Sequence, residues 1–460
     1  MAGPVDGLPG TDQGLRMPWS RSERRVVRRV LKPLQSFLEE EAASGVLLLA
    51  ATIVALAWAN SPWRDSYEDL WRSTLRVTLG PWSISEDLRH WVNDGLMSLF
   101  FLVVGLEIKR ELLTGELRSV RAAALPAVAA LGGMVVPALI YVALNSGGEG
   151  ANGWGIPMAT DIAFALGVLT VAARHAPANL KPFLLTLAIV DDIGAIVLIA
   201  LLYSSGITWG ALGVAAGFCV LMVVIQRIHV RSTTVYVVLG VGVWIATFKS
   251  GVHPTIAGVA LGLLTPAVPF QRPRAVSDEA HRVADETVDD PSPPDADAHH
   301  WLHLAALSRE AVSPLARVES ALHPSTSFVI VPAFALANAG VHLTAKAIGD
   351  AATSAVAVGI VLGLVVGKLA GISLASWVAV RAGLARLPEG ITWNHLVGTA
   401  AVAGIGFTVS LFMAELAFTR AQLTDTAKVG ILGASLLAGA VGYAVLRAGA
   451  GRGPRRDIAE

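Results

Sequence analysis

Residues 187–195 read LAIVDDIGA and place two adjacent aspartates inside an apolar segment. The segment runs from 181 to 202 and is long enough to cross a bilayer, because the hydrocarbon core takes about 20 residues of helix. A carboxylate at mid-bilayer costs at least about 2.5–3.5 kcal/mol on insertion scales, so an acid retained there indicates function. Asp191 and Asp192 therefore predict a membrane helix that carries a polar site.

The composition of the whole chain is that of a polytopic membrane protein. Hydrophobic residues make up 54% of the 460 positions and charged residues 15%, against about 25% charged residues in ordinary soluble proteins. The 35 basic and 35 acidic residues cancel, so we expect a lipid bilayer and no nucleic acid as partner. The single cysteine, Cys219, excludes a disulfide framework and a cysteine-rich metal site.

Apolar segments predict an all-α fold of about twelve transmembrane helices. Uncharged segments lie at 42–63, 122–148, 193–226, 232–248, 250–271, 320–345 and 429–446. Segments with charges inside them lie at 90–112, 151–173, 181–202, 353–380 and 392–419. The run 193–226 ends one helix and forms the next, because residues 203–206, YSSG, are typical of a tight turn.

Basic residues predict the orientation. When the loops are taken alternately, 26 of the 35 Lys and Arg fall on one side and 8 on the other, with Lys368 inside a span. The positive-inside rule then places both termini in the cytoplasm. We expect a basic segment over 1–41, helices 1–8 over 42–266, a linker over 267–313, helices 9–12 over 314–447 and a tail over 448–460.

The linker 267–313 differs in composition from the rest of the chain. It is rich in prolines and acids, and it contains four histidines, His281, His299, His300 and His303. Low hydrophobicity with like charges and prolines predicts a disordered, solvated cytoplasmic linker. A metal site built from the histidines is the alternative.

Two further charges lie inside predicted spans, Asp161 in PMATDIAFALG (157–167) and Lys368 in GLVVGKLAG (363–371). Asp161 could instead cap a helix end at the interface, and Lys368 could extend along the span to the surface. An ion pair between Lys368 and one aspartate would lower the cost of burying both groups. Adjacent helical residues point about 100° apart, so Asp191 and Asp192 would meet different partners.

Glycine and proline interrupt two of the predicted spans. Gly155, Pro157 and Thr160 precede Asp161, and residues 403–408 read AGIGFT. Backbone groups freed in this way must be satisfied by protein or by water in a cavity. Interrupted helices in corresponding places of two halves indicate an ion site near the midplane with opposed helix dipoles.

Seven motifs in chain order carry a family resemblance. They are FFLVVGLEIKRE (100–111), ATDIAFALG (159–167), VDDIGAI (190–196), KSGVH (249–253), FALANAGV (334–341), GK (367–368) and GIGFT (404–408). Together they resemble the NhaA family of bacterial sodium/proton antiporters, over residues 35–447 apart from the acidic linker.

The resemblance implies a secondary active transporter of the bacterial inner membrane, built from inverted-topology repeats. It implies no enzyme activity and no cofactor. Such a transporter would export Na⁺ or Li⁺ in exchange for H⁺, electrogenically and under regulation by pH, and a hairpin over 64–89 would join a homodimer. Asp192 resembles the principal cation ligand, so Asp161 and Asp192 would bind Na⁺, with Thr160 beside them. Asp191 resembles the acid that pairs with Lys368. Competition between a proton and a hard cation for such carboxylates is antiport.

The resemblance also implies that regulation by pH depends on residues at the cytoplasmic mouth of the transporter. The matching positions here are Glu107, Arg110, Glu111, Arg317, Glu319 and His323. Ser320 and Ala316 depart from the histidine and lysine of the family pattern. Glu415 departs too, and could be an additional acid for protons or cations or a satisfied interface residue.

Three other functions would also use intramembrane acids. A sodium-coupled importer of the same fold would need a larger polar cavity near the interrupted helices. An intramembrane aspartyl protease would need Tyr-Asp and Gly-x-Gly-Asp motifs, whereas the acids here follow Thr160 and Val190. A passive Na⁺ channel would need a ring of repeated acids.

Overall fold

The two spans that the sequence interrupts are bent at the same places in the structure. The computed structural model describes residues 41–79, 82–173, 176–204, 206–230, 232–288 and 298–450. Two of the three described helix pairs that bend at short breaks lie at these places: η5 (Ala151–Met158) meets α7 (Ile162–Ala172) at 40°, and α19 (Trp393–Val402) meets α20 (Phe407–Ala417) at 44°. The connecting residues, 159–161 and 403–406, are not helical.

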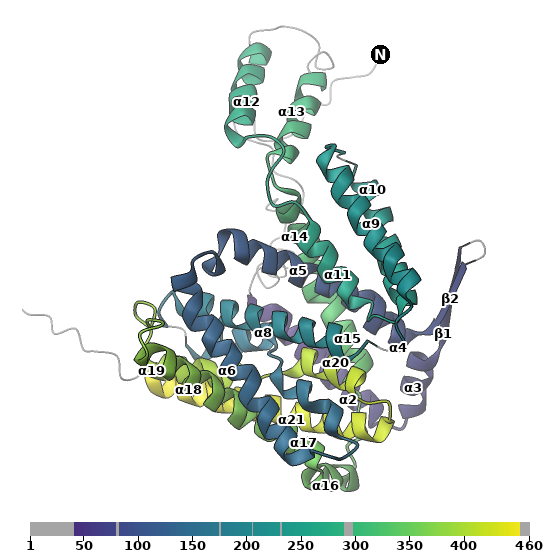
Figure 1. The fold of residues 1–460 in the computed structure, drawn as a ribbon, viewed down its shortest axis with the longest axis vertical. Coiled ribbons are helices and arrows are strands. Elements are labelled where there is room, and N and C mark those ends of the chain that lie inside the picture. Colours follow the sequence, from purple (N-terminus) through teal and green to yellow (C-terminus); the bar gives the residue numbers. More distant parts are fainter. Residues whose placement is uncertain are drawn as a thin grey trace, which may run out of the picture.

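Helices form most of the first part of the chain. They are α2 (Glu41–Ala59), α3 (Arg64–Arg72), α4 (Leu88–His90), η3 (Trp91–Leu96), α5 (Met97–Thr114), η4 (Glu116–Arg118), α6 (Val120–Asn145), α8 (Leu180–Leu202), α9 (Trp209–Arg227), α10 (Thr233–Ser250) and α11 (Thr255–Leu264). A hairpin of β1 (Thr74–Leu79) and β2 (Trp82–Asp87) interrupts them, with Thr74 opposite Asp87 in an antiparallel register. It projects from the side of the bundle (Figure 1) and lies within 64–89, the range in which the resemblance implies a hairpin.

The second part of the chain is helical where it is described. Its remaining elements are α12 (Pro273–Val288), α13 (Ala298–Glu310), α14 (Pro314–Ser325), η6 (Thr326–Ile330), α15 (Val331–Asn338), α16 (Ala345–Thr353), α17 (Ala355–Val361), η7 (Leu362–Gly367), α18 (Lys368–Arg381) and α21 (Ala421–Ala450). Three of the elements, η3, η6 and η7, are π-helical turns inside longer helices. Such turns are rare and occur frequently at functional sites.

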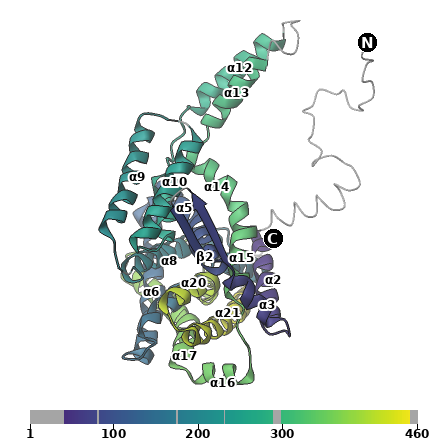
Figure 2. The same cartoon turned by 90° about the vertical axis from the view of Figure 1, so that its right-hand side faces the viewer.

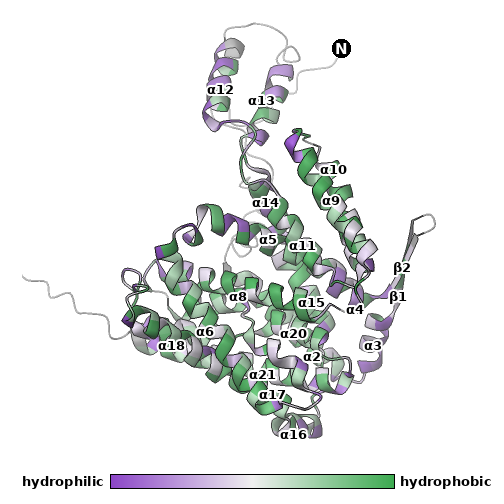
Figure 3. Cartoon of the chain, viewed as in Figure 1, coloured by the Kyte–Doolittle hydropathy of each residue, from purple (hydrophilic) through white to green (hydrophobic). Residues whose placement is uncertain are grey.

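The helices confirm a polytopic membrane protein. Among the described residues, eight are long and apolar enough to cross a membrane, and up to eleven spans result if each of three bent pairs is one span. The apolar helix α11 is shorter, at 10 residues. Figure 3 shows the bundle dominated by hydrophobic residues, whereas α12 is largely hydrophilic and α13 contains residues of both kinds.

The sequence predicts a disordered linker over 267–313, but the structure has two helices there. α12 and α13 lie side by side and project beyond the bundle (Figures 1 and 2). Val276 and Val283 of α12 are buried and share one helix face. The N–H groups of Phe270 and Gln271 both donate to the Glu310 carbonyl, at 3.1 Å, and close the base. A narrow apolar face therefore orders a segment whose overall composition is polar. Within the described chain, no three His, Cys, Asp or Glu side chains come together as a metal site would need.

Close packing of α6 against α18 positions Lys368. A Cβ atom at Gly132 would lie 2.3 Å from the carbonyl oxygen of Gly371, and one at Gly371 would lie 2.2 Å from that of Gly132. Small residues at such a crossing let two backbones approach closely. A Cβ at the neighbouring Gly133 would lie 3.6 Å from Cδ of Lys368, so the lysine side chain extends along this glycine surface.

Candidate functional site

The two helix breaks meet inside the bundle. The Asp161 N–H donates to the carbonyl of Ile405 at 2.6 Å, and the Ser410 hydroxyl of α20 donates to the Ile156 carbonyl of η5 at 2.8 Å. Backbone groups that the breaks release from one helix are thus satisfied by the other. This arrangement is what allows non-helical backbone at membrane depth.

The Asp161 carboxylate lies between two helix N-termini. It caps α7 by accepting the Phe164 N–H (3.1 Å), and at α20 it accepts both the Thr408 N–H (3.1 Å) and the Thr408 hydroxyl (2.6 Å). The side chain is buried. Each helix N-terminus carries about half a positive charge, so Asp161 compensates both ends and is held by three hydrogen bonds.

Thr160, Asp191 and Lys368 form a second group beside it. Lys368 is ion-paired with Asp191 and donates to the Thr160 hydroxyl at 3.0 Å, and both charged side chains are fully shielded from solvent. The Thr160 hydroxyl lies 2.7 Å from Oδ2 of Asp191 and 2.9 Å from the Ala403 carbonyl. Its single proton serves one of these acceptors at a time. The Ala403 carbonyl closes the C-terminal end of α19, where a nearby positive charge is favourable.

Asp192 differs from both groups, because its carboxylate has no hydrogen bond or ion pair among the described residues. It is only 5% exposed. Asp191, Glu107, Asp161 and Lys368 lie within electrostatic range of it, and three of these four neighbours are acids. A carboxylate that is buried without a partner is costly while it carries its charge.

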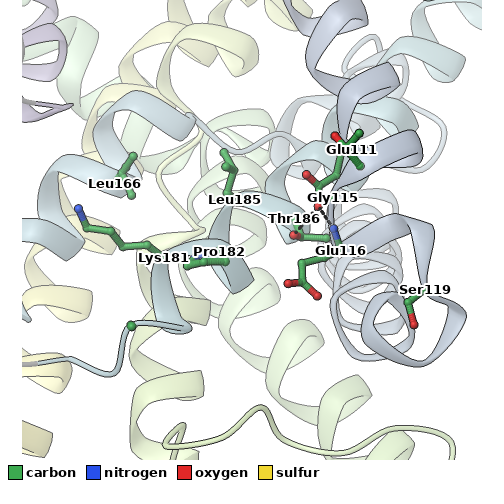
Figure 4. A pocket seen from close by; sticks show the side chains of 11 residues that line it. Glu111, Gly115, Glu116, Ser119, Leu166, Lys181, Pro182, Leu185 and Thr186 are labelled. Carbon is green, nitrogen blue, oxygen red and sulfur yellow. Dashed lines mark hydrogen bonds between the residues drawn. The ribbon is translucent and has the colours of Figure 1, made fainter. Parts of the chain in front are cut away.

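A cavity of about 580 Å³ opens beside the C-terminal end of α5. Its lining comes from three parts of the chain, namely 111–119, Leu166 of α7 and residues 178–186 at the start of α8. Figure 4 shows Glu111 and Thr186 turned toward one another, and the Thr186 hydroxyl lies 3.2 Å from Oε1 of Glu111. The cavity thus lies between the end of α5 and the start of α8, and Thr186 in its wall precedes Asp192 by six residues along α8.

The residues predicted at the mouth are only partly brought together. Arg110 of α5 is ion-paired with Glu319 of α14, and Glu107 lies within electrostatic range of both. Glu111 lines the cavity instead. In the described chain, the side chains of Arg317 and His323 make no hydrogen bond or ion pair.

Some residues at the site were not assigned a role from the sequence. Thr408 lies in the GIGFT motif, but only the fold shows that it donates to Asp161. Thr186 has no sequence signal beyond its place near the two aspartates. Glu415 pairs with Lys428 of α21 at 2.5 Å, with Lys428 4% exposed, which is the arrangement of an interface residue.

Comparisons with known proteins point to one family. A sequence model of the family described as Na⁺/H⁺ antiporter 1 matches residues 35–446. The chain is 48% identical to Na(+)/H(+) antiporter NhaA 2 of Sorangium cellulosum over 428 residues, 92% of this chain and 91% of the relative. It is 45% identical to Na(+)/H(+) antiporter NhaA of a Janthinobacterium over 444 residues, 95% and 96% of the two chains. It is also 48% identical to an NhaA antiporter of an Anaeromyxobacter over 422 residues, 91% and 92% of the two chains.

Proposed function

The chain belongs to the Na⁺/H⁺ antiporter 1 family, and from this premise we propose that it exports Na⁺ by letting Na⁺ and H⁺ compete for Asp192. As a member of this family it is a multi-pass membrane transporter and not an enzyme, and its substrates are Na⁺ and H⁺. We infer which residues bind the two ions, in which direction Na⁺ moves, and how much net charge each exchange carries across the membrane.

The observation that carries the proposal is that the buried Asp192 carboxylate has no partner among the residues that the structure describes. A hard cation such as Na⁺ prefers oxygen ligands, and a carboxylate that binds a cation has to release its proton. Each binding event therefore excludes the other, and exchange follows if the site faces the two sides of the membrane in turn. Asp161 is the second cation ligand, with Thr160 beside it, and the hydrogen bonds from Thr408 hold its carboxylate in place.

The ion pair of Lys368 and Asp191 contributes a second proton-linked step. Protonation of Asp191 would release Lys368, so the pair can exchange a proton each time the site opens. Exchange of more than one proton for each sodium ion makes transport electrogenic. Each elementary charge moved across the membrane is worth about 2.3 kcal/mol per 100 mV, so the membrane potential would drive export.

Orientation and regulation follow from the same geometry. The distribution of basic residues favours cytoplasmic termini, so the cavity near Glu111 faces the cytoplasm and is where Na⁺ enters. The Arg110–Glu319 pair beside Glu107 joins α5 to α14 at this mouth, and it is the candidate for pH regulation, together with Arg317 and His323. Li⁺ is a second substrate, since it is also a hard monovalent cation, and the β1–β2 hairpin joins two copies of the chain.

Everted membrane vesicles test the proposal. A proton gradient is imposed by respiration, and a fluorescent amine reports its collapse when Na⁺ or Li⁺ is added. We expect collapse with the unaltered chain and none with Asp192→Asn or Asp161→Asn. Asp350→Asn, which changes an exposed acid of α16, serves as the matched control. Undiminished exchange in both site variants would overturn the assignment of Asp161 and Asp192. If the exchange rate is the same with and without a membrane potential, set by valinomycin and K⁺, transport is not electrogenic.

A further inference from the structure

A buried lysine lies near the start of α21, beside the end of the interrupted span. Nζ of Lys428 lies 2.5 Å from Oε1 of Glu415 in α20, and the two side chains are 4% and 21% exposed. Asp425 of α21 lies within electrostatic range of both charges. Because a buried charge that loses its partner is strongly destabilising, Glu415 and Lys428 form a unit that joins α20 to α21.

α21 is a closely packed support for Lys428. A Cβ atom at Gly430 would lie 3.0 Å from Cα of Ala357 in α17. Further along the helix, a Cβ at Gly442 would lie 3.0 Å from the backbone nitrogen of Val402 in α19. Small residues let helices approach this closely, so backbone contacts at two levels set the position of α21. Lys428 therefore extends from a helix that is itself held in place.

α20 is held less directly than α21. Residues 403–406 ahead of it are not helical, so α19 does not set its rotation through a continuous helix. Three consecutive apolar side chains, Leu411, Phe412 and Met413, are fully buried and point to different sides of the helix. Apolar contacts are non-directional, so this burial favours no single rotation of α20 about its axis. Directional polar contacts therefore decide the rotation.

The polar contacts of α20 lie toward both of its ends. Near its start, the Thr408 N–H and hydroxyl donate to Asp161, and the Ser410 hydroxyl donates to a carbonyl of η5. Near its end, Glu415 pairs with Lys428. Thr408 and Glu415 are seven positions apart, which is two turns or about 10 Å along one helix face. A rotation that took Glu415 away from Lys428 would therefore also turn Thr408 away from Asp161.

We propose that Glu415 and Lys428 are positioning residues for the cation site. Their ion pair fixes the rotation of α20 and so keeps the Thr408 donors directed at the Asp161 carboxylate. The inference rests on the proposed function, in which Asp161 is a cation ligand. Glu415 and Lys428 do not touch the cation themselves but act through Thr408, because a site binds well only when its ligands are held within about 0.5 Å of the productive geometry.

Kinetics in everted vesicles separate binding from turnover. The initial rate of exchange at rising Na⁺ concentrations gives the KM and the maximal rate. Glu415→Gln keeps the shape of the side chain and removes its charge. We expect the KM for Na⁺ to rise roughly threefold to tenfold, with a maximal rate within about twofold of that of the unaltered chain. Glu415→Gln combined with Lys428→Gln removes both charges, leaves no unpaired ammonium and should show the same rise.

An exchange of the two charges and a neighbouring ion pair are the controls. Glu415→Lys combined with Lys428→Glu forms the pair again with its charges exchanged, so the KM should return to within about twofold of the unaltered value. Glu149→Gln breaks the ion pair of Arg420 with Glu149, which joins the residues after α20 to those before η5. These two side chains are 66% and 61% exposed, and both the KM and the maximal rate should stay unchanged.

Thr408→Val tests whether the pair acts through Thr408. The hydroxyl contact to Asp161 is already absent in this background, so the rise in KM caused by Glu415→Gln should be smaller than in the unaltered chain. Two rises that multiply in full would overturn this route. An unchanged KM in the variant without both charges, or a lower melting temperature and maximal rate at unchanged KM, would overturn the positioning role. Failure of the proposed function is distinguishable, because Asp161→Asn would then leave exchange intact.

Discussion

Lys368 and Asp191, 177 positions apart in the chain, form an ion pair whose two side chains are fully shielded from solvent. The pair joins α18 to α8, and the Thr160 hydroxyl supplies a further polar contact to each charge. Oδ1 of Asp191 is buried without a partner. Oδ2 of Asp191 therefore accepts both hydrogen bonds, from Lys368 and from Thr160. The pair is stable only while both charges are present.

Asp191→Asn should destabilise the protein more than Asp192→Asn. The first change leaves the Lys368 ammonium buried and unpaired, which costs about 3–5 kcal/mol, whereas Asp192 has no partner to lose in the described part of the chain. Thermal unfolding in detergent, followed by the intrinsic tryptophan fluorescence, measures the difference. Addition of Lys368→Gln to Asp191→Asn should recover part of the loss, because it removes the unpaired charge. Equal melting temperatures for the two single variants would count against the pair as a stabilising contact.

Na⁺ should raise the melting temperature of the unaltered chain but not that of Asp192→Asn. A ligand that binds only the folded state stabilises it by RT ln(1 + [L]/Kd), or about 2.7 kcal/mol at a hundredfold excess over Kd. The measurement compares NaCl with choline chloride at equal ionic strength, so that screening is the same. A shift of equal size in both proteins would mean that Na⁺ binds elsewhere.

Local signals in the sequence identify the interrupted helices and their acids. Glycine and proline near Asp161, and the two glycines of 403–408, interrupt the helix within one turn of their own positions. The helix breaks can therefore be predicted without knowing the fold. The same holds for the spans, because apolar length is itself a local quantity. The free-energy cost of a carboxylate in a bilayer is by itself enough to single out the acids at 161, 191 and 192.

The partners of these residues depend on contacts that no local pattern contains. Thr408 lies 247 positions from Asp161 yet supplies two of its hydrogen bonds. The pairing of Glu415 with Lys428 likewise depends on how α20 packs against α21. The helix α12 went unpredicted for a different reason, since the few apolar residues of its buried face are outweighed by the acids around them.

Gly371→Ala should weaken both the fold and transport. Its Cβ would lie 2.2 Å from the Gly132 carbonyl, so α6 and α18 must separate, and overpacking of this kind costs about 1–3 kcal/mol. Lys368 is one turn away and would move with the helix. Gly213→Ala in α9 is the matched control, because no heavy atom lies within 4 Å of its added Cβ. There we expect a gain of about 0.5–1 kcal/mol from helix propensity. A loss in Gly213→Ala as large as in Gly371→Ala would show that close packing is not the cause.

Thr408→Val should lower Na⁺ exchange, because it removes the hydroxyl that donates to Asp161 while the backbone donor stays. A hydrogen bond to a charged group contributes about 1.5–3 kcal/mol, so the carboxylate would be held less firmly and the exchange rate should fall. Thr408→Ser keeps the hydroxyl and should retain most of the activity. Thr399→Val is the matched control, since the Thr399 hydroxyl is also buried but donates to the His395 carbonyl within its own helix (2.8 Å). Vesicle assays at equal protein density compare the three variants. If Thr399→Val loses as much exchange as Thr408→Val, the loss comes from a buried hydroxyl in general, and Asp161 does not depend on its contact across the two breaks.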